Sequence, residues 1–169
     1  MPLLWYRSHM LARAMVLCSL AGLFLELGSC TNQSCTEMGC LDSGTLSGEV
    51  TKPTGRVAVE LCFNGVCQQA TTDAAPSAGA CVPISAGTVV ASVCFQGDTP
   101  AGAQLLTGQL DLEHASLHDG DHFAITIRDA QTGAVLGLAD QKVQYATDHP
   151  NGPDCPGECK IASLKVAPP

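Results

Sequence analysis

The sequence predicts an all-β fold, an antiparallel β-sandwich stapled by disulfides and preceded by a signal-peptide helix. Short segments alternate apolar and polar residues with a period of two and are separated by turn residues, as sandwich strands are. Beyond the N-terminal segment, no stretch of the 169 residues combines sustained helical periodicity with capping residues. Ten cysteines in so short a chain indicate an oxidising compartment, where thiols pair.

The N-terminal segment has the composition of a secretory signal. Arg7 and Arg13 precede an apolar stretch over 15–27, which is shorter than the roughly 20 residues that a membrane span needs. We therefore expect residues 1–29 to act as a signal peptide. An ordinary secretory signal without lipidation and an uncleaved anchor are the alternatives.

The end of this segment carries a more specific motif. Leu27-Gly28-Ser29-Cys30 resembles the lipobox of bacterial lipoproteins, in which two small residues precede the cysteine that receives the lipid. The resemblance implies that Cys30 becomes the first mature residue, carries acyl chains such as palmitate and binds a membrane, since two or more chains anchor stably. Thr31 replaces the aspartate that retains such proteins at the inner membrane. The family rule therefore implies an outer-membrane lipoprotein of the cell envelope, facing the periplasm or the surface.

The mature chain divides into a tether and one domain. Residues 30–43 are polar and short of large apolar side chains, so we expect a tether. Residues 44–169 are enough for one sandwich core. Strands are expected over residues 44–51, 56–68 as a hairpin, 81–94 as a second hairpin, 103–112, 122–129, 134–145 and 160–166.

The first hairpin is centred on Asn64-Gly65. This dipeptide favours a type I′ turn, because both central residues of that turn need a positive φ. The turn places Cys62 opposite Cys67 in a non-hydrogen-bonded pair, where side chains are close enough to be bridged. We expect a disulfide there, worth roughly 2 kcal/mol, on the polar face with Glu60. The other face should line the core with Val57, Val59, Leu61, Phe63 and Val66.

The register of the second hairpin follows from its turn in the same way. A two-residue turn at Gly87-Thr88 sets Cys81 opposite Cys94, again at a non-hydrogen-bonded position. Pro83 lacks an N–H and fits only an edge strand. The core face of this hairpin should carry Val82, Ile84, Val89, Ala91 and Val93.

The mature chain has an even number of cysteines after Cys30, which suits four bridges. They are Cys35, Cys40, Cys62, Cys67, Cys81, Cys94, Cys155 and Cys159. Two pairings of the outer four are open: local bridges Cys35–Cys40 and Cys155–Cys159, or bridges that join the tether to the tail. Zinc is a poor alternative, because the usual two-residue spacing between paired ligands is missing.

One segment resembles an immunoglobulin-like domain. The run over 117–125, Leu-His-Asp-Gly-Asp-His-Phe-Ala-Ile, is similar to the E–F corner of that family, where an acidic turn precedes an aromatic residue. Here the aromatic is Phe123, so the hydroxyl of the family's tyrosine is missing, and the only tryptophan is Trp5. The resemblance implies an Ig-like topology and no antibody-type domain.

The tail and the first hairpin carry a second resemblance. Tyr145, the run Pro-Asn-Gly-Pro-Asp-Cys over 150–155, Cys159, and the hairpin over 62–67 look like cysteine-rich lipoproteins of myxobacteria. This resemblance implies a fold and an envelope location. It implies no activity.

Histidines cluster between His114 and His122. A helix would align imidazoles spaced by four, but Asp-Gly-Asp at 119–121 indicates a turn, and on a strand His114 and His118 would be about 13 Å apart. A loop that folds back would gather His118, His122 and Asp121. Weak transition-metal binding by these three residues is therefore the alternative to a polar edge of the sandwich.

The sequence excludes several functions. It has no Gly-x-Ser-x-Gly elbow and no phosphate-binding glycine loop, and we expect neither an enzyme nor a cofactor. A hydrolase whose triad is scattered along the chain is the remaining catalytic alternative. The formal net charge of −8 and an aromatic content of 4% are wrong for nucleic acid.

We therefore expect a non-enzymatic binding or envelope-structural module, anchored to a membrane, with an unknown protein partner. Loops at one end of a sandwich commonly form contact surfaces. The segments 114–122 and 148–158 are the polar loops that we expect to provide one.

Overall fold

The strands follow the period-two alternation of the sequence. The computed structural model describes residues 40–153, 155 and 157–169, and these residues form ten strands and no helix. The all-β prediction is confirmed. The signal segment 1–29, Cys30 and Cys35 lie outside the described residues. Within the described ranges no helical segment has the length and hydropathy to cross a bilayer.

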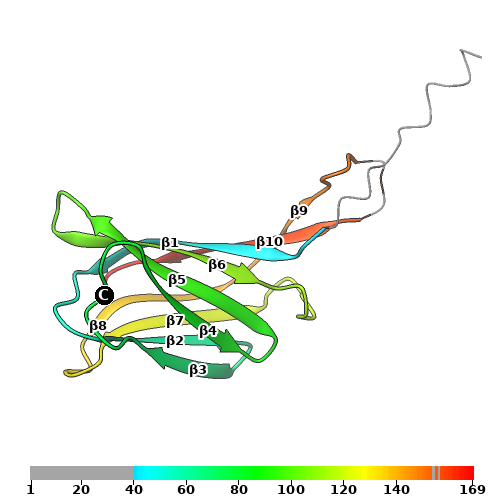
Figure 1. The fold of residues 1–169 in the computed structure, drawn as a ribbon. Helices are drawn as coiled ribbons and strands as arrows, with labels where there is room; N and C mark the ends of the chain where they lie inside the picture. The colour runs from blue at the N-terminus through cyan, green and yellow to red at the C-terminus, as the bar shows by residue number, and fades with distance from the viewer. Residues whose placement is uncertain (1–39, 154, 156) are drawn as a thin grey trace, which may run out of the picture. The chain divides into compact units, whose positions relative to one another are not determined.

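The strands form two sheets (Figure 1). The six-stranded sheet runs through β4 (Ala80–Ala86), β5 (Val89–Asp98), β6 (Ala103–Asp111), β1 (Ser43–Thr51), β10 (Cys159–Val166) and β9 (Ala146–Asp148). The four-stranded sheet runs through β3 (Val66–Thr71), β2 (Val57–Phe63), β7 (His122–Asp129) and β8 (Val135–Lys142). The predicted strands at 44–51, 103–112, 122–129 and 160–166 thus end within one residue of the observed bounds.

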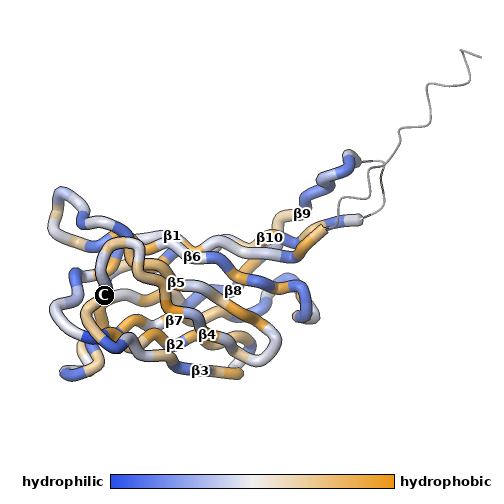
Figure 2. The backbone as a smooth tube through the Cα atoms, viewed as in Figure 1, coloured by the Kyte–Doolittle hydropathy of each residue, from blue (hydrophilic) through white to orange (hydrophobic). Residues whose placement is uncertain are grey.

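The core lies between the inward faces of the two sheets. Every second residue of β7 and of the first part of β5 is buried, and Figure 2 shows apolar and polar residues interleaved along the strands. The largest fully buried side chains are Phe95 and Phe123. Phe123 also packs against Phe63, with ring centroids 4.8 Å apart. Each such burial contributes roughly 2 kcal/mol to folding.

The hairpin of β2 and β3 has the predicted register. Asn64 and Gly65 both have positive φ, 47° and 84°, as a type I′ turn requires. Cys62 lies opposite Cys67, and the two form a disulfide. Four of the five predicted core residues on this hairpin are buried.

The fifth, Val66, was predicted to lie in the core, and this is wrong. Val66 is 51% exposed. It belongs to β3, an edge strand whose residues are nearly all exposed. A methyl group on Gly87 would be 3.7 Å from Val66 Cγ1. Val66 therefore lies against the turn between β4 and β5 at the rim of the sandwich and not between the sheets.

The hairpin of β4 and β5 also has the predicted register. Its strands flank a turn at Gly87-Thr88, Cys81 lies opposite Cys94, and the two are disulfide-bonded. β4 is the edge strand that Pro83 demands. All five predicted core residues of this hairpin are buried.

The strand order resembles the immunoglobulin Greek key with one replacement. The order β3-β2-β7-β8 matches C′-C-F-G, and β5-β6-β1 matches D-E-B. β4 is an additional edge strand. The place beside strand B, which strand A occupies in that family, is taken by the C-terminal strand β10.

The sheets are antiparallel except at this replacement. β10 runs parallel to β1, with Ser43 opposite Ile161 and Gly48 opposite Val166. β10 follows β9, to which it is antiparallel, and no hairpin joins it to β1, so a tight turn does not impose an antiparallel direction beside β1. The end of β10 also joins the other sheet, since Leu138 and Ala167 exchange two backbone hydrogen bonds of 2.9 and 3.0 Å.

The predicted strand 134–145 is too long. β8 ends at Lys142, and the next residues bond to the loop before β7: the Val143 amide donates to the Asp121 carbonyl, and the Gly120 amide donates to the Val143 carbonyl. The chain then forms β9, which the sequence analysis missed. Three residues without an apolar alternation, all exposed, give no strand signal.

Candidate functional site

A buried carboxylate, Asp121, is the centre of the corner that precedes β7. Its side chain is 7% exposed. Oδ1 accepts a hydrogen bond from Asn64 Nδ2 at 2.9 Å. Oδ2 accepts two more, from the His118 amide and from the Tyr145 hydroxyl, both at 2.9 Å. These donors come from the β2–β3 turn, the loop before β7 and the segment after β8, so one carboxylate joins three parts of the chain.

The environment of this carboxylate favours its charged form. Burial works against ionisation of Asp121, but the hydrogen bonds from Asn64, the His118 amide and Tyr145 together outweigh it and hold the pKa below its usual range. Burial, and then the bond to Asp121, raises the pKa of the Tyr145 hydroxyl. The pair is therefore a neutral phenol donating to a carboxylate at neutral pH.

Tyr145 also corrects an expectation about the corner. The resemblance placed Phe123 where the immunoglobulin family has tyrosine, and so predicted a corner without a tyrosine hydroxyl. The structure supplies that hydroxyl from the end of another strand connection, 24 residues along the chain from Asp121. The Lys160 ammonium lies 5.8 Å from the centre of the Tyr145 ring and donates to the Leu117 carbonyl, which ties β10 to the same corner.

The three candidate metal ligands are neighbours that do not converge. His118 touches Asp121 through its backbone amide, and its side chain is exposed. The His122 ring bonds instead to Asp140, with 2.6 Å between Nε2 and Oδ1. Among the described residues the only three ligand atoms within 4.8 Å of one another belong to Glu60, Cys62 and Cys67. His118 and His122 thus lie on a polar edge of the sandwich, on either side of the buried Asp121 in the sequence.

The His122–Asp140 pair has part of the geometry of a catalytic dyad. In a triad, the second ring nitrogen would accept a hydrogen bond from a nucleophile. Among the described contacts no serine, threonine or cysteine bonds to the His122 ring. The pair is exposed on the outer face of the four-stranded sheet.

A disulfide joins the tether to the last strand. Cys40 forms a disulfide with Cys159, with a Cα–Cα distance of 5.3 Å. Asp42 Oδ1 accepts from the Lys160 amide at 2.7 Å, and the Asp42 carbonyl accepts from the Leu112 amide. Of the two open pairings, the local bridge between Cys155 and Cys159 is therefore wrong, and so is Cys35–Cys40, because β10 lies beside the start of β1. Cys155 is disulfide-bonded as well.

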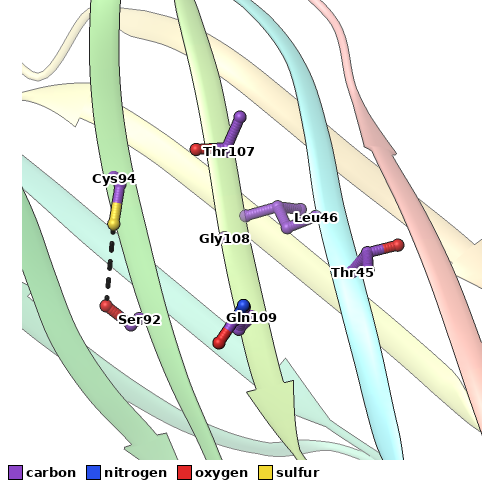
Figure 3. Close-up of a pocket in the computed structure, with 7 residues that line it drawn as sticks. All are labelled: Thr45, Leu46, Ser92, Cys94, Thr107, Gly108 and Gln109. Atoms are coloured by element: carbon purple, nitrogen blue, oxygen red, sulfur yellow. Dashed lines mark hydrogen bonds between the residues drawn. The ribbon is translucent and has the colours of Figure 1, made fainter. Parts of the chain in front are cut away.

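The outer face of the six-stranded sheet is covered by small hydroxyl and amide side chains. One register row across β10, β1, β6 and β5 reads Ser163, Thr45, Gln109 and Ser92. An open depression of about 380 Å³ lies on this face (Figure 3). Its lining residues are Thr45, Leu46, Ser92, Cys94, Thr107, Gly108 and Gln109.

The described side chains that line this depression are uncharged. The Ser92 hydroxyl lies 3.8 Å from Cys94 Sγ and, because the sulfur is bridged, can only donate to it. Hydroxyl and amide groups offer both hydrogen-bond donors and acceptors. They suit contact with neutral polar groups better than binding of a metal ion or a phosphate. No group here has the chemistry of a nucleophile with a base.

Comparisons with protein-family models, curated proteins and solved structures find no match for this chain.

The two predicted contact segments differ in structure. Residues 114–122 form the loop that Asp121 organises, with Leu117 buried in the core. The segment 148–158 begins in a turn closed by the Gly152 amide and the His149 carbonyl, and residues 154 and 156 lie outside the described set.

Sequence reasoning missed four residues that build these sites. Asn64 was used only as a turn former, although its side chain bonds to Asp121. Tyr145, Asp140 and Asp42 carried no local signal, because each meets its partner only after strands far apart in sequence are paired.

Proposed function

We propose that this chain is an extracytoplasmic lipoprotein, anchored by acyl chains on Cys30, whose β-sandwich is a non-enzymatic binding or structural module of the cell envelope. The observation that carries the proposal is the set of three disulfides whose cysteines both lie in the described residues, two of them on edge hairpins. Such bridges form and persist in oxidising compartments outside the cytoplasm.

The disulfide between Cys40 and Cys159 supports an anchored arrangement. Cys30 and Cys40 are ten residues apart, and a fully extended chain of that length spans at most about 35 Å. A lipid on Cys30 would keep the sandwich within that distance of the membrane surface. Since Cys40 is covalently joined to β10, a force on the tether would act on a strand that is paired on both sides, to β1 and to β9.

The geometry favours binding or structure over catalysis. The buried carboxylate is fully engaged in hydrogen bonds, and the exposed His122–Asp140 pair has no bonded nucleophile among the described residues. The net charge of −8 favours cationic or neutral partners and keeps the body off anionic headgroups. Thr31, in place of aspartate, supports the outer membrane as the destination.

The test is the intact mass of the membrane-extracted protein, before and after reduction. We expect the mass of residues 30–169 plus acyl chains, and a gain of about two hydrogen atoms per bridge on reduction. A Cys30→Ser variant should lose the acyl mass and leave the membrane fraction. Cys18→Ser, a change inside the predicted signal, is the matched control and should leave the mature mass unchanged.

A wild-type mature mass without acyl chains would contradict the anchor and leave a freely secreted domain. Free thiols at Cys40 and Cys159, or at Cys81 and Cys94, would contradict the oxidising compartment.

A further inference from the structure

We propose that Cys62, Cys67 and Glu60 form a reversible metal site: once the Cys62–Cys67 disulfide is reduced, the two thiolates and the carboxylate bind one thiophilic divalent cation such as Zn²⁺. The two sulfurs and a carboxylate oxygen of Glu60 all lie within 4.8 Å of one another. Glu60 Oε1 is 3.7 Å from Cys62 Sγ. This inference goes beyond the proposed function and does not depend on lipidation.

The backbone holds these three side chains together without the disulfide. β2 is paired on both sides, to β3 and to β7, and the Asn64-Gly65 turn fixes the register of Cys62 and Cys67. Glu60 and Cys62 are two residues apart on one strand and so point to the same face. Reduction would therefore leave two thiols facing each other beside a carboxylate, a site organised before the metal arrives.

The ligand set fits a soft divalent cation. Zn²⁺ takes four ligands in a tetrahedron, with sulfur about 2.3 Å and carboxylate oxygen about 2.0–2.2 Å from the metal. Two thiolates and one carboxylate supply three ligands, and water can supply the fourth. Binding releases the two thiol protons, so affinity should rise with pH.

An exposed cysteine residue on an edge strand gives a reductant access to the disulfide. Cys67 lies exposed on the edge strand β3, whereas Cys62 is buried. A thioredoxin-type dithiol can attack Cys67 Sγ with one thiolate. The Cys62–Cys67 bond then breaks, and its electron pair and a proton go to Cys62 Sγ. The second thiol of the reductant releases Cys67, and the reductant ends as a disulfide, so two electrons and two protons are transferred.

The other hairpin disulfide provides an internal contrast. Cys81 and Cys94 have the same Cα–Cα distance of 4.0 Å across paired strands, and Cys81, like Cys67, is an exposed residue of an edge strand. Beside Cys94, however, the neighbouring group is the neutral Ser92 hydroxyl at 3.8 Å. Among the described residues no third metal ligand lies with this pair. The carboxylate is thus present beside one of the two cross-strand pairs and not described beside the other.

The first test compares the two pairs within one molecule. The full chain in detergent is reduced with a phosphine, which is oxidised to the phosphine oxide, and is then alkylated with and without Zn²⁺. Mass mapping reads the alkylation rate of each cysteine. We expect Zn²⁺ to slow alkylation of Cys62 and Cys67 at least about tenfold more than that of Cys81 and Cys94. Equal protection of both pairs, or protection of neither, would overturn the proposal.

The second test isolates the carboxylate. We expect Glu60→Gln to weaken Cd²⁺ binding by the reduced chain at least about tenfold, the lower range for loss of a metal-site group, as read from the sulfur-to-cadmium absorption band. Glu49→Gln, on an exposed glutamate of β1, is the matched control and should not change it. An unchanged affinity in Glu60→Gln would remove Glu60 from the site. Neither variant changes a cysteine. Circular dichroism of both variants checks that the fold is retained.

Discussion

Asn64 and Asp121, 57 residues apart in sequence, are joined by a hydrogen bond of 2.9 Å. The same Asn64 side chain accepts from the His122 amide at 2.9 Å, and its backbone amide donates to the His122 carbonyl. Its φ of 47° is the conformation that the β2–β3 turn needs. One residue therefore shapes the hairpin tip and holds the first residue of β7, so that the tip and the corner form one unit.

We predict that Asn64→Gly destabilises the domain by about 1–3 kcal/mol. Glycine keeps the positive φ, but it leaves Asp121 Oδ1 and the His122 amide without their partner. Urea unfolding followed by circular dichroism measures the change. An unfolding midpoint equal to that of the wild type would show that the turn conformation is the whole role of Asn64.

Asn64→Asp is a useful comparison for the same bond. Aspartate also accepts from the His122 amide, but its carboxylate would face that of Asp121, so the loss of stability should be larger at pH 7 than at pH 4. A loss that does not depend on pH would contradict this repulsion.

The second prediction concerns acid. Because the hydrogen bonds hold the pKa of Asp121 below its usual range in the folded state, the unfolded chain binds the proton more tightly. The stabilisation is fully present above the ordinary aspartate pKa of about 3.9 and is lost as the pH falls through the lower, folded value. Asp121→Asn should remove part of this acid dependence and leave stability flatter below about pH 4.

Asp73→Asn is the control for the acid prediction, since Asp73 is an exposed loop residue. Its pH profile should follow the wild type. Asp129 contributes in the same pH range, because the Thr132 amide and hydroxyl and the Gln131 amide lower its pKa. A profile of Asp121→Asn that parallels the wild type would assign the acid response to Asp129 and other carboxylates.

The third prediction ranks two disulfides by the loops that they close. Cys40–Cys159 spans 119 residues and Cys62–Cys67 spans 5. On the chain-entropy model the long loop is worth about 5 kcal/mol and the short one about 2 kcal/mol. Double serine variants of each pair, compared by thermal unfolding, should show the larger loss for Cys40→Ser with Cys159→Ser. Equal losses would mean that native contacts, and not loop closure, dominate both.

The local part of the fold could be predicted from sequence. Strand alternation, Asn64-Gly65 and Gly87-Thr88 act over a few residues, and they were enough to set both hairpin registers and both cross-strand disulfides. The prediction that Val66 lies in the core was wrong, because alternation shows which face of the sheet a residue lies on. It does not show whether the other sheet covers that face at the sheet edge.

The long-range part could not be predicted in the same way. The parallel pairing of β1 with β10, and the Cys40–Cys159 bridge that follows from it, depend on which sheet the last strand joins. No residue near Cys159 encodes that choice. The surroundings of the candidate metal ligands could not be predicted for a related reason: Asp121 accepts hydrogen bonds from Asn64 and Tyr145, which only the folded chain brings together.

The fourth prediction tests that parallel pairing. Gly48 of β1 lies opposite Val166 of β10, and a methyl group on Gly48 would be 1.9 Å from the Val166 carbonyl oxygen. Its φ of 154° is also one that residues with a side chain rarely adopt. Gly48→Ala must therefore push the two strands apart, and we expect a loss of about 3 kcal/mol.

Gly97 offers the matched control, because a methyl group there would meet no atom within 4 Å. Gly97→Ala should change the unfolding temperature little. Amide hydrogen exchange separates a local from a global effect: in Gly48→Ala, protection should fall first along β1 and β10, where the backbones are forced apart. If Gly48→Ala were as stable as Gly97→Ala, β10 could not pack against β1 at this distance, and the replacement of strand A by the C-terminal strand would need revision.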